Sequence, residues 1–160
     1  AGGTTATTGS SLWALRLGRQ DVQWVWGAEG QLEMADPRVE SVTGENSKRL
    51  TAYVQELLAY PGLQVASVYS IGRIKKLTED SGKGLTDSLI SSLLAKFPVG
   101  KGPNVMFCTR RSLAQLQQSR TATTPTGADA AWPKEIVGMN GESIPIFATE
   151  ALSDVEALTL

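Results

Sequence analysis

In two runs near the start of the sequence, every second position is apolar or aromatic: LWALRLG (12–18) and VQWVW (22–26). An alternation with a period of two is typical of β-strands. Since only the polar residues 19–21 separate the runs, the pattern predicts a β-hairpin. Its alternating tryptophans are expected to pack in the core rather than to form stacking platforms for sugars or bases: Trp13, Trp24 and Trp26.

Apolar residues that recur every three or four positions predict three helices. The first has its apolar stripe at residues 50–58, with Asn46 or Ser47 as its N-cap and Pro61-Gly62 at its end. The second is LTDSLISSLLAKFP (85–98), with Thr86 as its N-cap. The third follows a short buried strand, VMF (105–107), and is capped by Thr109. Each helix is expected to bury one apolar stripe against the rest of the domain.

The remaining pattern predicts strands. The run 63–77 reads as one strand, which would span roughly 50 Å unless Gly72 breaks or bulges it. Asn140-Gly141 lies between two apolar runs and predicts a second hairpin. Residues 27–46 are rich in turn formers and charges and read as an exposed excursion. Strands and helices in this order predict an α+β fold.

Composition narrows the range of functions. The chain has 160 residues and a net charge of −1, so it lacks the strong positive charge of most nucleic-acid-binding domains. No apolar run approaches the 18 or more residues of a membrane helix. There is no histidine, which removes the commonest general base and the commonest metal ligand. The small polar residues 1–10 read as a linker or a cut end, so we expect the chain to be a piece of something longer.

Cys108 is the one cysteine, and its neighbours Arg110 and Arg111 raise the question of a reactive thiolate. A protease-type cysteine needs a histidine, which this sequence lacks, and a phosphatase-type cysteine needs an anion-binding loop instead of a helix. A helix N-terminus can lower the pKa of a thiol, but free cysteine is most often buried. We therefore expect Cys108 to be a core residue.

The residue spacing also argues against a phosphate-binding loop and a catalytic pair of carboxylates. SGKGLTD (81–87) and the sequence 100–102 lack the order Gly-Lys-Ser/Thr that a phosphate-binding loop requires. The carboxylates are scattered, and Glu79 and Asp80 are adjacent in a predicted loop where they would not face each other. We expect no catalytic residue, no cofactor and no metal site.

Two groups of basic residues are candidate contact sites. Arg110 and Arg111 fall in the first turn of a predicted helix, where the helix dipole disfavours cations. We expect either solvent exposure or a compensating anion, such as a carboxylate of a neighbouring subunit. Arg73, Lys75 and Lys76 form a basic patch, which is typical of a solvated face or of a site for an acidic neighbour.

Longer blocks of sequence carry a family resemblance. LTDSLISSLLAKFP leads to NVMFCTRRSLAQLQQSR (104–120) and then to the hairpin VGMNGESIPIFATEAL (137–152). Before them stand GSSLWALRLG (9–18), VQWVW and YPGLQVASVYSIGRIKKL (60–77). Together these blocks resemble the major capsid protein of tailed bacteriophages, whose coat fold is shared with herpesvirus shells.

The resemblance implies a peripheral-domain-like part at residues 11–78 and an axial-domain-like part at 79–160, the latter clustering around capsomer axes. In the more familiar order the peripheral strands largely follow the axial part, so a permuted segment order is implied. The family's N-terminal arm, extended loop and spine helix are not found in this sequence, and its crosslinking residues cannot be placed on it.

The function that the resemblance implies is structural: self-assembly into the icosahedral head that encloses phage DNA. The protein would be a late protein, made in the bacterial cytoplasm and located in the virion, without enzymatic activity. Its partners would be copies of itself in hexamers and pentamers, scaffold, portal or decoration proteins, and packaged DNA contacted non-specifically, but no membrane. Candidate contact sites are the excursion 27–46, the loop 119–132, Arg73, Lys75, Lys76, Arg110, Arg111 and Trp132.

Two alternatives remain. One is another phage structural protein, such as a tail or decoration component, which would form a ring or a tube instead of a shell. The other is a small α+β enzyme or ligand-binding module, for which a deep pocket with two converging carboxylates would be needed.

Overall fold

The structure, a computed structural model, describes residues 8–27, 32–121 and 130–157. It consists of two compact units, residues 24–64 and the rest of the chain, which we call the ribbon and the body. Each is described by itself. The body combines helices with a mixed sheet and the ribbon contains strands, so the mixed α/β composition agrees with the predicted α+β class.

The body is built on a six-stranded mixed sheet with β1 near its centre. β1 runs antiparallel to β8, with Leu12 opposite Ile74, and antiparallel to β9, with Ala14 opposite Met106. β11 is parallel to β9, β10 is antiparallel to β11, and β12 pairs with the start of β1. The bounds are β1 Thr8–Leu15, β8 Ile71–Leu77, β9 Val105–Cys108, β10 Glu135–Val137, β11 Ser143–Ala148 and β12 Glu156–Ala157.

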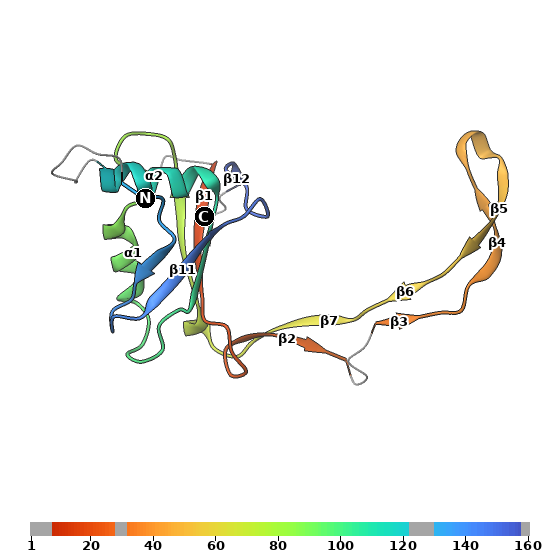
Figure 1. The fold of residues 1–160 in the computed structure, drawn as a ribbon, viewed down its shortest axis with the longest axis horizontal. Helices are drawn as coiled ribbons and strands as arrows, with labels where there is room; N and C mark the ends of the chain where they lie inside the picture. Colours follow the sequence, from red (N-terminus) through yellow and green to blue (C-terminus); the bar gives the residue numbers. More distant parts are fainter. Residues whose placement is uncertain (1–7, 28–31, 122–129, 158–160) are drawn as a thin grey trace. The chain divides into compact units, whose positions relative to one another are not determined.

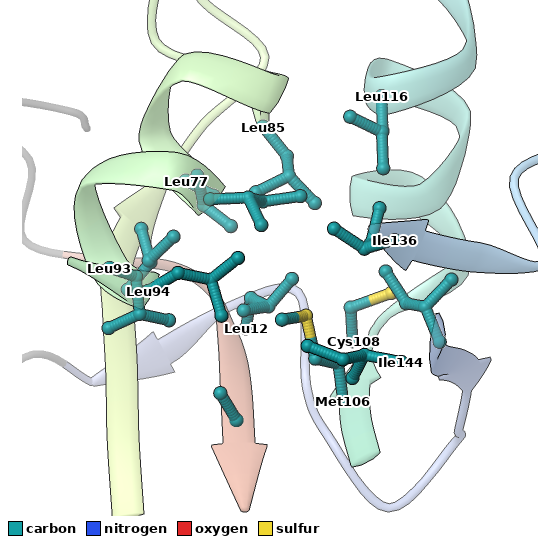
Figure 2. Close-up of a cluster of buried hydrophobic side chains, with 14 residues drawn as sticks. Leu12, Leu77, Leu85, Leu93, Leu94, Met106, Cys108, Leu116, Ile136 and Ile144 are labelled. Carbon is teal, nitrogen blue, oxygen red and sulfur yellow. The ribbon is translucent and has the colours of Figure 1, made fainter. Parts of the chain in front are cut away.

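Two helices, α1 (Asp87–Leu94) and α2 (Arg110–Thr121), cover one face of this sheet. Figure 2 shows side chains from both helices and from the strands meeting in one cluster. Burying such side chains contributes about 1.5–3 kcal/mol each, so this cluster is the main source of the body's stability. It includes Leu12, Ile74, Leu77, Leu85, Ile90, Leu93, Leu94, Met106, Cys108, Leu116, Ile136 and Ile144.

The helix starts follow the caps that the sequence predicts. The hydroxyl of Thr86 accepts a hydrogen bond from the Leu89 amide at 3.4 Å. The hydroxyl of Thr109 accepts one from the Ser112 amide at 3.2 Å. These hydrogen bonds confirm both predicted caps. A side-chain oxygen at the N-cap stabilises a helix because it satisfies an amide that has no partner within the helix.

The predicted hairpin at Asn140-Gly141 is also confirmed. It joins β10 and β11, with Val137 opposite Ser143. The Gly141 amide donates to the Gly138 carbonyl at 3.1 Å, which closes a turn. Gly141 has φ +83°, a conformation that costs other residues energy and glycine little.

The ribbon consists of successive antiparallel strand pairs. β2 (Val22–Trp26) pairs with β7 (Pro61–Val65), β3 (Glu33–Met34) with β6 (Leu57–Leu58), and β4 (Arg38–Thr43) with β5 (Arg49–Val54). Figure 1 shows β2, β3 and β4 following one another along one line and β5, β6 and β7 along the other. None of the described residues between 24 and 64 is buried.

The helix predicted at residues 50–58 is wrong, because this segment forms β5 and β6 of the ribbon. Its apolar stripe meets no core: Leu50 is 60% exposed and Tyr53 is 84% exposed. Pairing with β4 satisfies the backbone instead, in a segment where Thr51, Tyr53 and Val54 favour strands.

The hairpin predicted at 12–26 is wrong in its pairing, although both strands exist. β1 pairs with β8 and β9 in the body, whereas β2 pairs with β7. Trp24 and Trp26 are 67% and 51% exposed, so the prediction that they pack in the core is also wrong. A ribbon of two strands has no second layer to bury them.

The long strand predicted at 63–77 is interrupted. Between β7 and β8 lies a short 3₁₀ turn, Val68–Ser70, where the Ser67 hydroxyl accepts from the Tyr69 amide at 3.2 Å. The break therefore precedes Gly72, which lies inside β8. A Cβ at Gly72 would come within 2.8 Å of the Phe97 ring. This glycine lets the sheet approach that ring closely.

The contacts divide the chain within β2 and within β7, not at the boundary expected between residues 78 and 79. β8 and β9 lie on either side of that expected boundary, and both pair with β1 in one sheet. In the described part of the chain, no helix is long and apolar enough to cross a membrane.

Candidate subunit-contact surfaces

Cys108 lies at the end of β9 and is fully buried. Burial raises the pKa of its thiol to about 12, because an apolar environment disfavours the thiolate. The prediction that Cys108 is a core residue is confirmed. Its thiol therefore stays protonated at neutral pH in the folded chain, and its side chain is out of contact with solvent.

The body has a hollow of about 470 Å³ that two carboxylates line, Asp21 and Glu142. Asp21 forms a salt bridge with Arg16 at 2.9 Å and accepts a hydrogen bond from Ser70 at 2.6 Å. Glu142 accepts from the Asn140 amide at 3.1 Å. Asp21 thus links the segment after β1 to the turn before β8, and Glu142 stabilises the turn between β10 and β11. No group of three or more His, Cys, Asp or Glu side chains in the described ranges could hold a metal ion.

The sheet face opposite the helices carries a row of aromatic side chains across neighbouring strands. Trp13 on β1 lies opposite Phe107 on β9, and Phe107 lies beside Phe147 on β11. The ring centroids of the two phenylalanines are 6.0 Å apart. Trp13 and Phe107 are half-buried and Phe147 is 51% exposed. This row is an apolar surface that a partner could cover.

Arg73, a predicted contact residue, ends this row on β8. Its guanidinium lies 4.7 Å from the centre of the Trp13 ring and forms a salt bridge with Glu156 at 2.7 Å. It also donates two hydrogen bonds to the Ser11 hydroxyl, at 3.0 and 2.8 Å. The charge of Arg73 is therefore already matched within the body.

Lys75 and Lys76 follow at an irregular point of β8, where they stand opposite Ser11 alone. Lys76 has φ +64° and is half-buried, which identifies this point as a β-bulge. Lys75 is exposed, and none of the described carboxylates lies within ion-pair distance of its ammonium group. Of the three residues in the predicted basic patch, Arg73 is paired within the chain, and neither lysine forms an ion pair with a described carboxylate.

Arg110 and Arg111 lie in the first turn of α2, as predicted. Arg110 faces Glu150 at 3.2 Å, and both side chains are 84% exposed. Arg111 is more buried: it donates to the carbonyls of Leu77 (3.3 Å) and Asp154 (2.8 Å), and it lies 3.4 Å from the carboxylate of Asp154.

The anions that compensate the helix dipole at α2 therefore come from the same chain. An intersubunit salt bridge is not needed to explain either arginine. Trp132, the last predicted contact residue, is 58% exposed. In the predicted loop 119–132, residues 122–129 lie outside the described residues, as do residues 28–31 of the predicted excursion 27–46.

The ribbon is the surface that the sequence did not reveal as such. Its exposed large apolar side chains occur on every strand pair, and they include Trp24, Leu32, Met34, Val39, Leu50, Tyr53, Leu57, Tyr60 and Leu63. Residues 24–64 contain six acidic and three basic residues and have a net charge of −3. The other residues contain ten acidic and twelve basic ones, which gives +2. The two units are thus oppositely charged.

Comparison with models of known protein families and with curated proteins found no match for this chain.

Proposed function

We propose that this chain is a structural protein, the major capsid subunit of a tailed bacteriophage, which assembles into the icosahedral head around phage DNA. Its partners are copies of itself in hexamers and pentamers, together with scaffold, portal or decoration proteins. It contacts packaged DNA non-specifically. It is a late protein, made in the host cytoplasm and located in the virion, and it catalyses no reaction.

The observation that carries the proposal is the ribbon. A two-stranded ribbon is marginally stable in water on its own, since it lacks a second layer. This one exposes apolar side chains along its length, among them Tyr53 at 84% and Met34 at 67%. Exposed apolar surface of this extent is typical of sites that a partner covers. A subunit that lays such a ribbon on its neighbours gains stability from assembly.

The charge distribution supports association between like copies. Strongly charged subunits repel one another when they crowd together, whereas this chain has a net charge of −1. Within it, an acidic ribbon and a basic body complement each other across two copies. The aromatic row on the open sheet face adds a second apolar surface for contacts. Many modest contacts of this kind are what a shell requires.

Removal of the ribbon tests the proposal. In the variant, residues 27–60 are replaced by a short Gly-Ser turn between β2 and β7, in the full-length parent protein. We expect the parent to sediment as large, homogeneous particles and the variant to remain small with its body folded. If the variant assembles as the parent does, or if the parent stays small under all assembly conditions, the proposal is wrong.

A further inference from the structure

The outer edge of β8 has no strand partner among the described residues, since β8 pairs with β1 on its other side. The Arg16 amide donates to the Ser70 carbonyl at 2.9 Å. Because antiparallel pairs alternate, the amides and carbonyls of Ile71 and Arg73 then point away from β1. No hydrogen bond from the described part of the chain meets these groups. An edge of this kind is a template for an added strand.

α1 lies beside this edge and turns it into a groove. Two adjoining hollows of about 240 and 340 Å³ share Arg73, Leu93 and Lys96. One wall comes from β8 and the preceding turn, and the other from α1 and the residues after it. The apolar part of the lining is Val68, Tyr69, Ile71, Leu93 and Phe97. A groove between an edge strand and a helix is a known way to bind an extended peptide by strand addition.

The charge of this groove selects its occupant. Lys75 and Lys96 line it, both are exposed, and neither has a carboxylate within ion-pair distance in the described residues. Arg73 adds a third positive charge, which Glu156 already pairs. Pairing of two β8 edges from two copies would bring like charges together. The groove therefore fits an acidic extended segment with apolar side chains.

The ribbon contains such a segment, LEMAD (32–36). Leu32 and Met34 are 59% and 67% exposed, while Glu33 and Asp36 are exposed and form no ion pair with a described residue. β3, which lies in this segment, pairs only with β6 among the described strands, so its other edge is open. Five residues span roughly 17 Å of strand, which matches residues 71–75 of β8.

We propose that residues 32–36 of one copy add as a strand to the β8 edge of a second copy. Leu32 and Met34 pack on the apolar lining of the groove, and Glu33 and Asp36 lie next to Lys75 and Lys96. The inference deepens the proposed function and rests on it, because it names the surface on which a ribbon lies in the assembly.

A charge-swap cycle tests this contact. One variant carries Lys75→Glu and Lys96→Glu, and the other carries Glu33→Lys and Asp36→Lys. Self-association is measured by sedimentation velocity at low and high salt, and circular dichroism verifies the fold of each variant. We expect each variant alone to associate at least about tenfold more weakly, because attractive charge pairs become repulsive. An equimolar mixture of the two is expected to regain association, since swapped charges attract again.

The control variant carries Lys101→Glu and Lys134→Glu, which change the net charge by the same amount at exposed positions outside the groove lining. If it weakens association as much as the groove variant, if the groove variant associates normally, or if the mixture does not recover, the inference is wrong. If the parent protein still forms shells when its groove charges are reversed, the proposed function stands and the proposed contact is wrong. If the charge-swap variants and their mixture behave as expected but the protein never forms closed shells, the proposed contact stands and the proposed function is wrong.

Discussion

The guanidinium of Arg73 lies over the ring of Trp13, with its central carbon 4.7 Å from the ring centre. Glu156 and Ser11 hold it there, at 2.7 Å and at 2.8–3.0 Å. β8, β1 and the C-terminal part of the body are thereby linked through one side chain. From the sequence Arg73 is expected to contact a neighbour, whereas its partners in the structure lie within the body.

Replacement of Arg73 by alanine should therefore destabilise the chain itself. Loss of the cation–π contact and of the charged hydrogen bonds is expected to lower the free energy of unfolding by about 1–2 kcal/mol. Arg73→Lys should recover only part of this, because an ammonium group cannot reproduce the fork that contacts Ser11 and Glu156. Urea denaturation measures the effect. Lys75→Ala is the control, and equal stability of the two alanine variants would contradict the assignment.

Two adjacent arginines at the start of α2 should differ in their contribution to stability. Arg111→Ala removes the hydrogen bonds that the guanidinium donates to the carbonyls of Leu77 and Asp154, together with the ion pair to the Asp154 carboxylate, so we expect a loss of about 1–3 kcal/mol. Arg110→Ala removes only an exposed pair with Glu150 and should leave the free energy of unfolding unchanged within error. Thermal unfolding of both variants measures the difference. A larger loss for Arg110 would show that the two sites are wrongly assigned.

The close approach of β8 to Phe97 predicts that Gly72 does not tolerate a side chain. A Cβ there would lie 2.8 Å from the Phe97 ring and 3.0 Å from Leu93, so Gly72→Ala should cost about 1–3 kcal/mol through overpacking. Gly27→Ala is the matched control, because nothing lies within 4 Å of its Cβ position.

Addition of Phe97→Leu to Gly72→Ala should restore part of the loss, since the smaller side chain makes room for the new methyl group. Chemical denaturation of the single and double variants measures this coupling. If the two changes are additive, the ring does not set the limit at Gly72.

Burial of Cys108 predicts a stability change at alkaline pH. The pKa of its thiol is raised from 9.0 to about 12 on folding. A raised pKa means that the folded state holds its proton over a range where the unfolded state has lost it. The resulting stability is complete below pH 9 and decreases as the pH rises from 9 towards 12, by at most about 1.4 kcal/mol per pH unit.

Comparison with Cys108→Ala isolates this effect, because lysines and tyrosines titrate in the same range in both proteins. The difference in unfolding free energy between the two proteins should shrink with rising pH. The same burial predicts that thiol reagents label Cys108 only when the chain unfolds. Rapid labelling of the folded chain at neutral pH would contradict the burial.

Local signals in the sequence predict α1, α2, β9 and the β10–β11 hairpin. Thr86 and Thr109 have their amide partners within three residues, and the turn at Asn140-Gly141 depends only on its own backbone. Features of this kind are fixed over a few residues, so one sequence contains the information.

Local signals do not predict which strands pair when the strands are far apart in the sequence. β1 and β2 are neighbours in the chain, yet their partners β8 and β7 follow some 40 residues or more after them. Residues 50–58 have helical apolar spacing, but the spacing predicts a helix only if a core exists for its stripe to face. In a ribbon there is none. For the same reason the prediction that Trp24 and Trp26 pack in the core is wrong, since both are exposed.

The candidate contact surfaces were partly predictable. The basic residues of β8 are visible in the sequence, but the sequence does not show that Arg73 pairs with Glu156, far along the chain, whereas Lys75 pairs with none of the described carboxylates. Lys96 was missed because it reads as an ordinary residue at the end of a helix. Only the position of α1 beside β8 brings it to the groove with Lys75.

Electron microscopy of the full-length parent protein, negatively stained after expression and purification under assembly conditions, directly tests whether this chain builds a capsid. We expect closed shells of uniform diameter from the parent, and small dispersed particles from the ribbon-deleted variant prepared in parallel. Rings or tubes would indicate a tail or decoration component instead. Small dispersed particles from the parent itself would contradict the claim that this chain builds a capsid.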